Sequence, residues 1–219
     1  MIPKEKLLQE VAAFSDVHLA DCDHFVCIYG SYASGHHTEV SDIDMFFAVS
    51  DVCLYDPGIF KKFVIDLHMR YDLTIDNEVP YENKLIASYK DVEHAVALQA
   101  FTKEGDRFRV PPIIKSREFL SSPEIRWRLL FNALTTPHKF VHGNKERYED
   151  YRERAERSLL TLAQGLSLSG GESCEDLFEV LVTGKGGEEG EGYLGYKKDR
   201  EDVMVYLRAL IGRYCQDRP

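Results

Sequence analysis

Apolar and polar positions follow two different spacings along the first 50 residues. Between Lys4 and Phe14 the apolar residues fall three or four apart, on one side of a helix. Between His24 and Tyr29 the pattern changes to a dense run of β-branched and aromatic residues, which is typical of a buried strand. A polar loop rich in small residues separates this run from a second one, Ile43 to Val49. The pattern predicts a helix followed by two neighbouring strands.

The next 50 residues continue this mixture. Asp56-Pro57-Gly58 has the chemistry of a turn and precedes helical spacing from Ile59 to Met69. From Leu73 to Val79 apolar and polar residues alternate, which predicts a third strand with an acidic face. Pro80 ends this strand, and the segment from Tyr81 to Phe101 is expected to form one broken helix or two short ones.

Strand patterns disappear after about residue 115, where helix-starting signals take over. Residues favoured at helix N-termini occur at Ser122-Pro123-Glu124, at Asn144, at Ser173 with Asp176, and at Asp199 with Asp202. The glycine-rich stretch 184–192 is expected to be a loop or a mobile lid. We therefore expect an α+β protein, with a small mixed sheet flanked by helices in residues 1–114 and a helical bundle in residues 115–219.

Composition narrows the class of protein. A formal net charge of −10 disfavours binding to long nucleic acids, which depends on neutralising many phosphates with Lys and Arg. The longest apolar runs are far shorter than the roughly 20 residues that cross a bilayer, and the first residues lack a signal-peptide core. A soluble, cytoplasmic protein without membrane contact is expected. The five cysteines have no CxxC spacing and are expected to be reduced thiols packed as small hydrophobic residues.

Two carboxylates stand at the start of the second predicted strand, in Ser41-Asp42-Ile43-Asp44. Alternate residues of a strand point to the same face, so Asp42 and Asp44 project together, about 6 to 7 Å apart at the backbone. Mg²⁺ prefers carboxylate and phosphate oxygens, and paired-metal sites hold two ions about 3.5 to 4 Å apart. The two carboxylates are therefore suited to bind two metal ions beside a substrate phosphate.

A third carboxylate from another strand usually completes such a site. Asp76 is the first choice, because it lies in the middle of the predicted acidic face. Glu78 shares that face and is the second choice, and Asp72, in the turn before the strand, is the third.

Residues suited to bind phosphate flank these carboxylates in the sequence. Gly30 and Ser31 follow the first strand, where a residue without a side chain lets the backbone approach a phosphate and a hydroxyl can donate to its oxygens. Lys84 follows the predicted acidic strand and has two interpretations, a cation that neutralises phosphate charge or an exposed salt-bridge partner.

The order of a strand, Gly-Ser, about ten residues and then Asp-x-Asp at the start of an apolar strand resembles the signature of the DNA polymerase β-like nucleotidyltransferase superfamily. The resemblance covers residues 25–50 directly and extends to Asp76 if that residue lies on the third strand. It implies a nucleoside triphosphate with two Mg²⁺ ions, or Mn²⁺ in their place, and transfer of a nucleoside monophosphate to an acceptor hydroxyl with release of pyrophosphate. Relatives that modify aminoglycosides and lincosamides carry a mostly helical second domain.

By position, the resemblance assigns the β and γ phosphates to Gly30 and Ser31 and both metal ions to Asp42 and Asp44. It implies that Asp76 binds the catalytic metal ion and accepts the proton of the acceptor hydroxyl. The chain departs from the commonest family pattern at His36-His37, where many relatives carry charged or small residues. The residues around Asp76 are also less apolar than is usual at the third acidic position.

Four further groups have both a functional and a simpler interpretation, and the simpler one is preferred for each. The functional interpretations are a transition-metal site at His36 and His37, a metal site at His138 and His142, phosphate contacts from Arg126, Arg128 and Lys139, and a stacking surface at Tyr193, Tyr196 and Lys197. The simpler ones are exposed loop histidines, histidines without a metal role, solvated helix faces, and packing of the end of the glycine-rich loop.

The expected function is transfer of a nucleoside monophosphate, with ATP as the favoured donor, to a small hydroxylated acceptor such as an antibiotic or a natural-product intermediate. Two alternatives remain open. One is a toxin-like enzyme of the same fold that modifies a tRNA end or a protein side chain. The other is a catalytically silent module that retains the fold as an antitoxin, a sensor or a partner-binding subunit.

Overall fold

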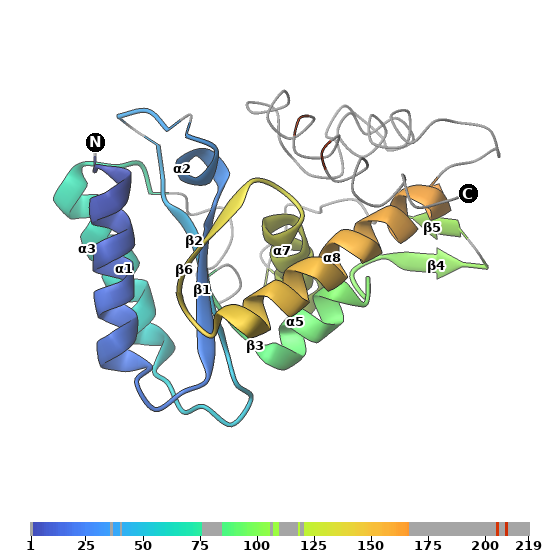
Figure 1. Cartoon of the computed structure of the whole chain (residues 1–219), viewed down its shortest axis with the longest axis horizontal. Coiled ribbons are helices and arrows are strands. Elements are labelled where there is room, and N and C mark those ends of the chain that lie inside the picture. Colours follow the sequence, from blue (N-terminus) through green and yellow to red (C-terminus); the bar gives the residue numbers. More distant parts are fainter. Residues whose placement is uncertain are drawn as a thin grey trace.

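The computed structural model describes residues 2–35, 37–39, 41–75, 85–105, 107–109, 118, 121–166, 205 and 209. Its elements form an α+β protein with a small mixed sheet (Figure 1). In chain order they are α1 (Lys4–His18), β1 (His24–Tyr29), α2 (Gly30–Ser34), β2 (Asp44–Val49), α3 (Pro57–Tyr71), β3 (Ile86–Ser88), α5 (Tyr89–Val96), β4 (Thr102–Glu104), β5 (Arg107–Arg109), α7 (Pro123–Leu134), β6 (His138–Gly143) and α8 (Lys145–Leu166). No helix of the described ranges is both long and apolar enough to cross a bilayer.

The main sheet has the strand order β3-β2-β1-β6. β1 is antiparallel to both of its neighbours, and Tyr29 at its end pairs with Asp44 at the start of β2 and with His138 at the start of β6. β3 runs parallel to β2. The end of β1 and the starts of β2 and β6 therefore lie at one end of the sheet, where Figure 1 shows α2. We call this the α2 end of the sheet.

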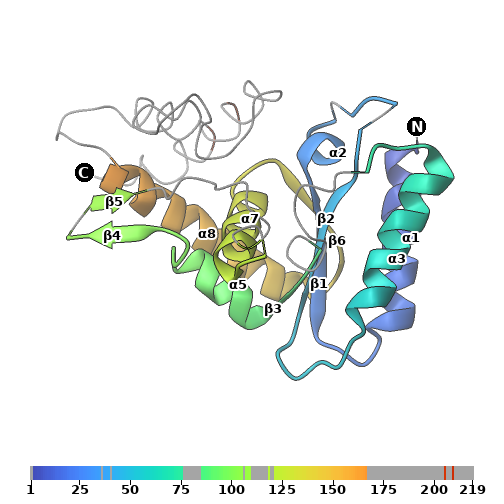
Figure 2. The same cartoon turned by 180° about the vertical axis from the view of Figure 1, so that it is seen from behind.

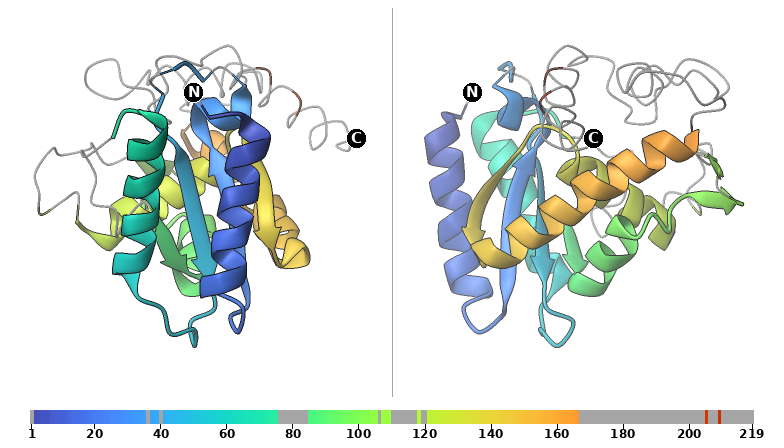
Figure 3. Two further views of the ribbon diagram at one scale, coloured as in Figure 1. Left: turned by 90° about the vertical axis from the view of Figure 1, so that its left-hand side faces the viewer. Right: turned by 45° about the vertical axis from the view of Figure 1, so that its right-hand side comes forward.

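Helices cover both faces of the sheet. α1 and α3 lie side by side along one face, and α5, α7 and α8 lie on the other (Figures 2 and 3). Alternate residues of β2 enter the two cores: Met45 and Phe47 pack toward α1 and α3, whereas Phe46 and Ala48 pack toward α5, α7 and α8. Burial on both faces explains why β1 and β2 are continuous apolar runs in the sequence.

Several predicted elements are confirmed. The first helix, the first two strands and the helix after the Asp56 turn form as α1, β1, β2 and α3. The Asp56 carboxylate accepts a hydrogen bond from the backbone N–H of Gly58 at 2.8 Å and so caps α3. Asn144 caps α8 in the same way, because its Oδ1 accepts from the backbone N–H of Arg147 at 2.9 Å.

The prediction for the strand beside β2 is wrong in part. That strand is β3, Ile86–Ser88, inside the segment expected to be helical. Residues 73–75 form no strand in the structure, although Leu73 is buried and Thr74 exposed as the alternation predicts, and residues 76–79 lie outside the described residues. The three residues of β3 are too few to show a period in the sequence, and they are a strand because they pair with β2.

A second correction concerns the C-terminal half, where strand patterns were expected to be absent. β6 extends the main sheet from residues beyond 115, and the small β4–β5 hairpin precedes it. His138 and His142 therefore lie on a strand and not on one helical face. β6 is a half-exposed edge strand, which has no strong apolar alternation to reveal it. The domain boundary at 114/115 and the C-terminal bundle stay predictions.

The cysteines differ from the expectation of five reduced thiols. Cys22, before β1, and Cys53, after β2, form a disulfide with their Cα atoms 5.5 Å apart. The antiparallel pairing of the two strands brings these flanking segments together, since Ser50 N–H also donates to the Asp23 carbonyl at 2.8 Å. Cys27 is a buried free thiol, as expected, and Cys174 and Cys215 lie outside the described residues.

The start of α5 is joined to α7 through a partly buried carboxylate. Asp91 forms a capping box with Ser88 and also accepts hydrogen bonds from Trp127 Nε1 and Arg126 Nη1, both at 3.0 Å. Burial raises the pKa of the Asp91 carboxyl, but the Trp127 hydrogen bond and the Arg126 guanidinium outweigh it and leave the pKa below its usual value. The carboxylate form therefore stabilises the folded protein.

We predict that Asp91→Asn lowers the free energy of unfolding at pH 7 by about 1 to 3 kcal/mol, because an amide cannot accept all of these hydrogen bonds or pair with Arg126. A lowered folded-state pKa stabilises the fold above the ordinary aspartate pKa of about 3.9. The difference between wild type and variant should therefore shrink as the pH falls below that value. Urea unfolding across pH measures it. Asp66→Asn, which breaks the exposed Lys62–Asp66 pair, is the control and should cost less than about 1 kcal/mol.

Candidate active site

Asp42 and Asp44 lie at the α2 end of the sheet, at the start of β2. Ile43, between them, is buried in the core with α1 and α3, whereas both aspartates are partly exposed. Asp44 shares its face of β2 with Phe46, which packs toward α5, α7 and α8. The Asp44 side chain therefore lies at the α2 end of the sheet, on the face covered by α5, α7 and α8.

Gly30 lies beside the Asp44 carboxylate. It follows Tyr29, the strand partner of Asp44, and has φ +63°, a left-handed conformation that favours glycine. A Cβ added at Gly30 would lie less than 3.0 Å from Asp44 Oδ2, a separation that real Cβ atoms essentially never show. It would also lie 3.2 Å from Asp44 Cγ. The backbone conformation therefore favours glycine, an added Cβ would have to displace the Asp44 carboxylate, and the predicted phosphate-binding residue is within contact distance of the predicted metal ligand.

The short helix α2 is held against α1. Lys4 Nζ donates a hydrogen bond to the Ala33 carbonyl at 3.2 Å, and Gly35 N–H closes the helix on the Ser31 carbonyl at 3.0 Å. Burial and the nearby charge of Lys139 lower the pKa of Lys4. Ser31 is partly exposed beside Gly30. The Gly-Ser turn thus has a fixed position next to the carboxylates.

A stacked pair of rings supports the loop between α2 and β2. The ring of Tyr32 is fully buried and stacks on His37, with centroids 4.2 Å apart and planes 15° apart. Burial raises the pKa of the Tyr32 hydroxyl, a backbone hydrogen bond with Ile2 lowers it, and the negative charge of Asp42 raises it further. His37 is therefore not the exposed loop histidine that the sequence suggested, and His36 lies outside the described residues.

His68 is a residue of this site that the sequence patterns missed. Its Nε2 accepts a hydrogen bond from the backbone N–H of Ile43 at 3.1 Å, and its Nδ1 lies 2.8 Å from the Val64 carbonyl. The side chain is 2% exposed, on the buried face of α3. The only sequence signal was a single histidine within the apolar stripe of a helix, and such a stripe does not reveal its partner.

Two of the basic residues considered for phosphate binding, Arg126 and Lys139, lie away from Asp44. Arg126 forms an ion pair with Asp91, which is hydrogen-bonded to Ser88. Ser88 is the last residue of β3 and lies at the end of the sheet opposite to α2. Arg128 is buried, so the expected solvated helix face is wrong for both arginines. Lys139 pairs with Ile28, whose side chain enters the core with α1 and α3, so Lys139 projects from the face opposite to Asp44.

The structure describes one of the three candidates for a third carboxylate. Asp76, Glu78 and Lys84 lie outside the described residues, as do Tyr193, Tyr196, Lys197 and the stretch 184–192. Asp72 is described: it is the exposed C-cap of α3, with φ 52°. No three His, Cys, Asp or Glu residues of the described ranges form a group that could hold a metal ion.

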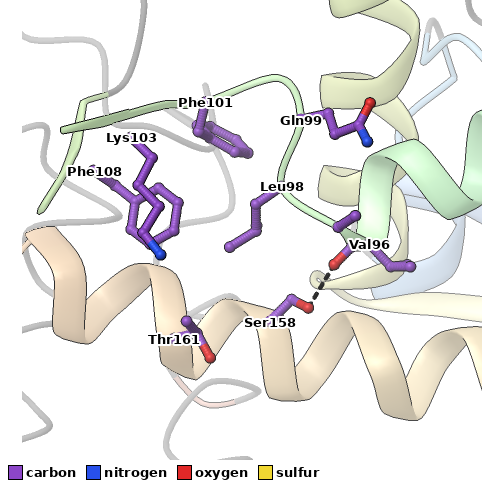
Figure 4. Close-up of a pocket in the computed structure, with 9 residues that line it drawn as sticks. Val96, Leu98, Gln99, Phe101, Lys103, Phe108, Ser158 and Thr161 are labelled. Carbon is purple, nitrogen blue, oxygen red and sulfur yellow. Dashed lines mark hydrogen bonds between the residues drawn. The ribbon is translucent and has the colours of Figure 1, made fainter. Parts of the chain in front are cut away.

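A pocket of about 430 Å³ lies apart from this site (Figure 4). It is formed by the turn after α5, the β4–β5 hairpin and α8, and none of its lining residues belongs to the main sheet or to α2. Leu98 and Phe101 point into it from the turn. Lys103 lies with its Nζ 5.7 Å from the centre of the Phe108 ring, and Ser158 donates to the Val96 carbonyl at 2.6 Å.

Comparisons of the chain with protein-family models, curated proteins and solved structures found no match. The resemblance to the DNA polymerase β-like nucleotidyltransferases therefore rests on the motif residues alone and stays a prediction. The contact between Gly30 and Asp44 is an observation that does not depend on it.

We predict that Gly30→Ala displaces the Asp44 carboxylate and weakens Mn²⁺ binding, measured by water-proton relaxation. Gly35→Ala is the matched control, because Gly35 also has a positive φ (+89°) but nothing within 4 Å of its added Cβ. Both variants should lose about 1 to 2 kcal/mol of stability from backbone strain. Equal Mn²⁺ affinity in the two variants would contradict a functional contact between Gly30 and Asp44.

Proposed function

We propose that the protein is a metal-dependent nucleotidyltransferase that transfers a nucleoside monophosphate from a triphosphate, with ATP favoured, to a hydroxyl of a small acceptor. The observation that supports this proposal most strongly is the position of Gly30 against the Asp44 carboxylate. A residue without a side chain at this point lets the phosphates of a nucleotide approach the protein backbone beside the metal-binding carboxylate. The two halves of the sequence motif are thus neighbours in space.

The donor set fits the proposed ions. Asp42 and Asp44 supply carboxylate oxygens, the ligands that Mg²⁺ prefers, and a third carboxylate is proposed from Asp76. Two bound Mg²⁺ ions, or Mn²⁺ ions, would offset the charge of the phosphates and clamp the attacking and leaving oxygens.

Within this proposal the other residues have separate roles. The Gly30 backbone and the Ser31 hydroxyl hold the β and γ phosphates by donating hydrogen bonds. Asp76 accepts the proton of the acceptor hydroxyl as that oxygen attacks the α phosphorus, and pyrophosphate leaves. Lys84 neutralises phosphate charge.

The charge and the disulfide bear on the acceptor and on the location of the protein. A net charge of −10 favours a cationic or neutral small molecule over a long nucleic acid. Disulfides are rare in reducing compartments, so the Cys22–Cys53 bond is an argument against the expected cytoplasmic location. No observation favours a tRNA or protein acceptor, or a silent binding module, over this proposal.

The proposal is tested by incubating the protein with each labelled nucleoside triphosphate, Mg²⁺ and a cell extract. We expect a labelled product that requires metal and that Asp42→Asn and Asp44→Asn each abolish, with little change in stability because adjacent carboxylates repel each other without metal. The free energy of unfolding of each variant is the control. Wild-type protein that neither binds a nucleotide nor forms a product would contradict the proposed function, and full activity in either variant would contradict the metal site.

The third carboxylate can be identified by a separate pair of variants. Asp76→Asn should lower turnover at least 100-fold, as is typical when a group that contacts the reacting atoms is removed. Asp72→Asn should change it less than about twofold, because Asp72 is an exposed helix cap. The measurement is steady-state rate against Mg²⁺ concentration. Equal and mild effects of the two substitutions would show that the third carboxylate comes from another residue.

A further inference from the structure

The backbone at Ile43 needs a partner that the sheet does not provide. The first described pair between β1 and β2 is Tyr29 with Asp44, so Ile43 precedes this ladder. Alternate amides of a strand point to the same side, and the amide of Phe47 donates to the Leu85 carbonyl beside β3 at 2.8 Å. Ile43 is four residues before Phe47, so its amide points to the same side of the strand. There it donates to His68 Nε2 on α3 and not to a strand.

The two partners of His68 determine its tautomer. The Val64 carbonyl can only accept a hydrogen bond, so the proton of the neutral ring is on Nδ1. The Ile43 amide can only donate, so Nε2 carries the lone pair. Both ring nitrogens are therefore used, and the ring has one orientation that satisfies both bonds.

Packing keeps the imidazole in this orientation. His68 is 2% exposed, and Val64 and Leu67 beside it on α3 are buried in the core that also contains Ile43. The backbone carbonyl of His68 accepts a hydrogen bond from the amide of Leu73 at 2.9 Å, which ties the residues after α3 to its last turn. A rigid helix thus holds the peptide that lies between the two carboxylates.

We propose that His68 is a positioning residue for the carboxylate pair: by accepting the Ile43 amide, it sets the backbone from which Asp42 and Asp44 project onto their metal ions. This inference rests on the proposed function, because it assigns His68 to the same metal site. It differs from a packing role in requiring an acceptor at the position of Nε2. Residues that orient metal ligands typically change metal affinity about 10-fold to 100-fold when they are replaced.

Three substitutions separate the acceptor from the bulk of the ring. In His68→Gln the side-chain oxygen can reach the position of Nε2 and accept the Ile43 amide. In His68→Asn the shorter amide reaches only the position of Nδ1, so it can donate to Val64 but cannot reach Ile43. His68→Leu fills the space without either bond. Gln and Asn have the same functional group, which makes Asn the matched control for Gln.

The test measures Mn²⁺ affinity by water-proton relaxation, hydrogen exchange of the Ile43 amide, and thermal unfolding of each variant. We expect His68→Gln to bind Mn²⁺ within about threefold of wild type and to keep the Ile43 amide protected. His68→Asn and His68→Leu should bind at least about 10-fold more weakly and lose that protection. These comparisons are made at a temperature at which all of the variants are folded.

Other outcomes contradict the inference in distinguishable ways. If wild type binds Mn²⁺ and all three variants bind it equally well, His68 has no positioning role, and the proposed function stands. If all three variants bind equally weakly, the ring acts by packing and not as an acceptor. If wild type itself binds no Mn²⁺, the proposed metal site is wrong, and the role of His68 in it is wrong as well.

Discussion

The antiparallel pairing of β1 with β2 is the interaction on which the candidate site depends. Its register places Tyr29 opposite Asp44, so the residue after β1 meets the first residue of β2. That residue is Gly30, whose left-handed backbone turns the chain into α2 directly beneath the Asp44 carboxylate. A shift of one residue would reverse the faces of every side chain in β2 and separate these two groups. The register is therefore a functional as well as a structural constraint.

Burial on both faces fixes this register. Phe47 packs with α1 and α3 while Phe46 packs with α5, α7 and α8, so a one-residue slip would exchange the two sets of side chains and disrupt the close packing of both cores. One of these two cores also holds the supporting groups of the site. Tyr32 and His68 belong to the side of α1 and α3, and they contact the loop and the peptide from which the carboxylates project.

Polar side chains that were inconspicuous in the sequence connect the elements. Asp91 joins α5 to α7 through Trp127 and Arg126, and His68 joins α3 to the start of β2. Each is largely buried and hydrogen-bonded, as buried polar groups must be to avoid a desolvation cost. One of the two connections lies at the candidate site, and the other lies toward the opposite end of β2.

The sequence by itself determined the elements with strong local patterns, namely α1, β1, β2, α3 and the starts of α7 and α8, and it identified Gly30, Asp42 and Asp44 as candidate residues. Only the tertiary structure decided that β3 and β6 are strands, that Arg126 serves Asp91, that Cys22 pairs with Cys53, and that His68 holds Ile43. The physical reason is range. Periodicity, caps and turns act over a few neighbouring residues, whereas these contacts join residues 25 to 35 positions apart, or strands still farther apart, and the choice of partner depends on how the whole chain packs.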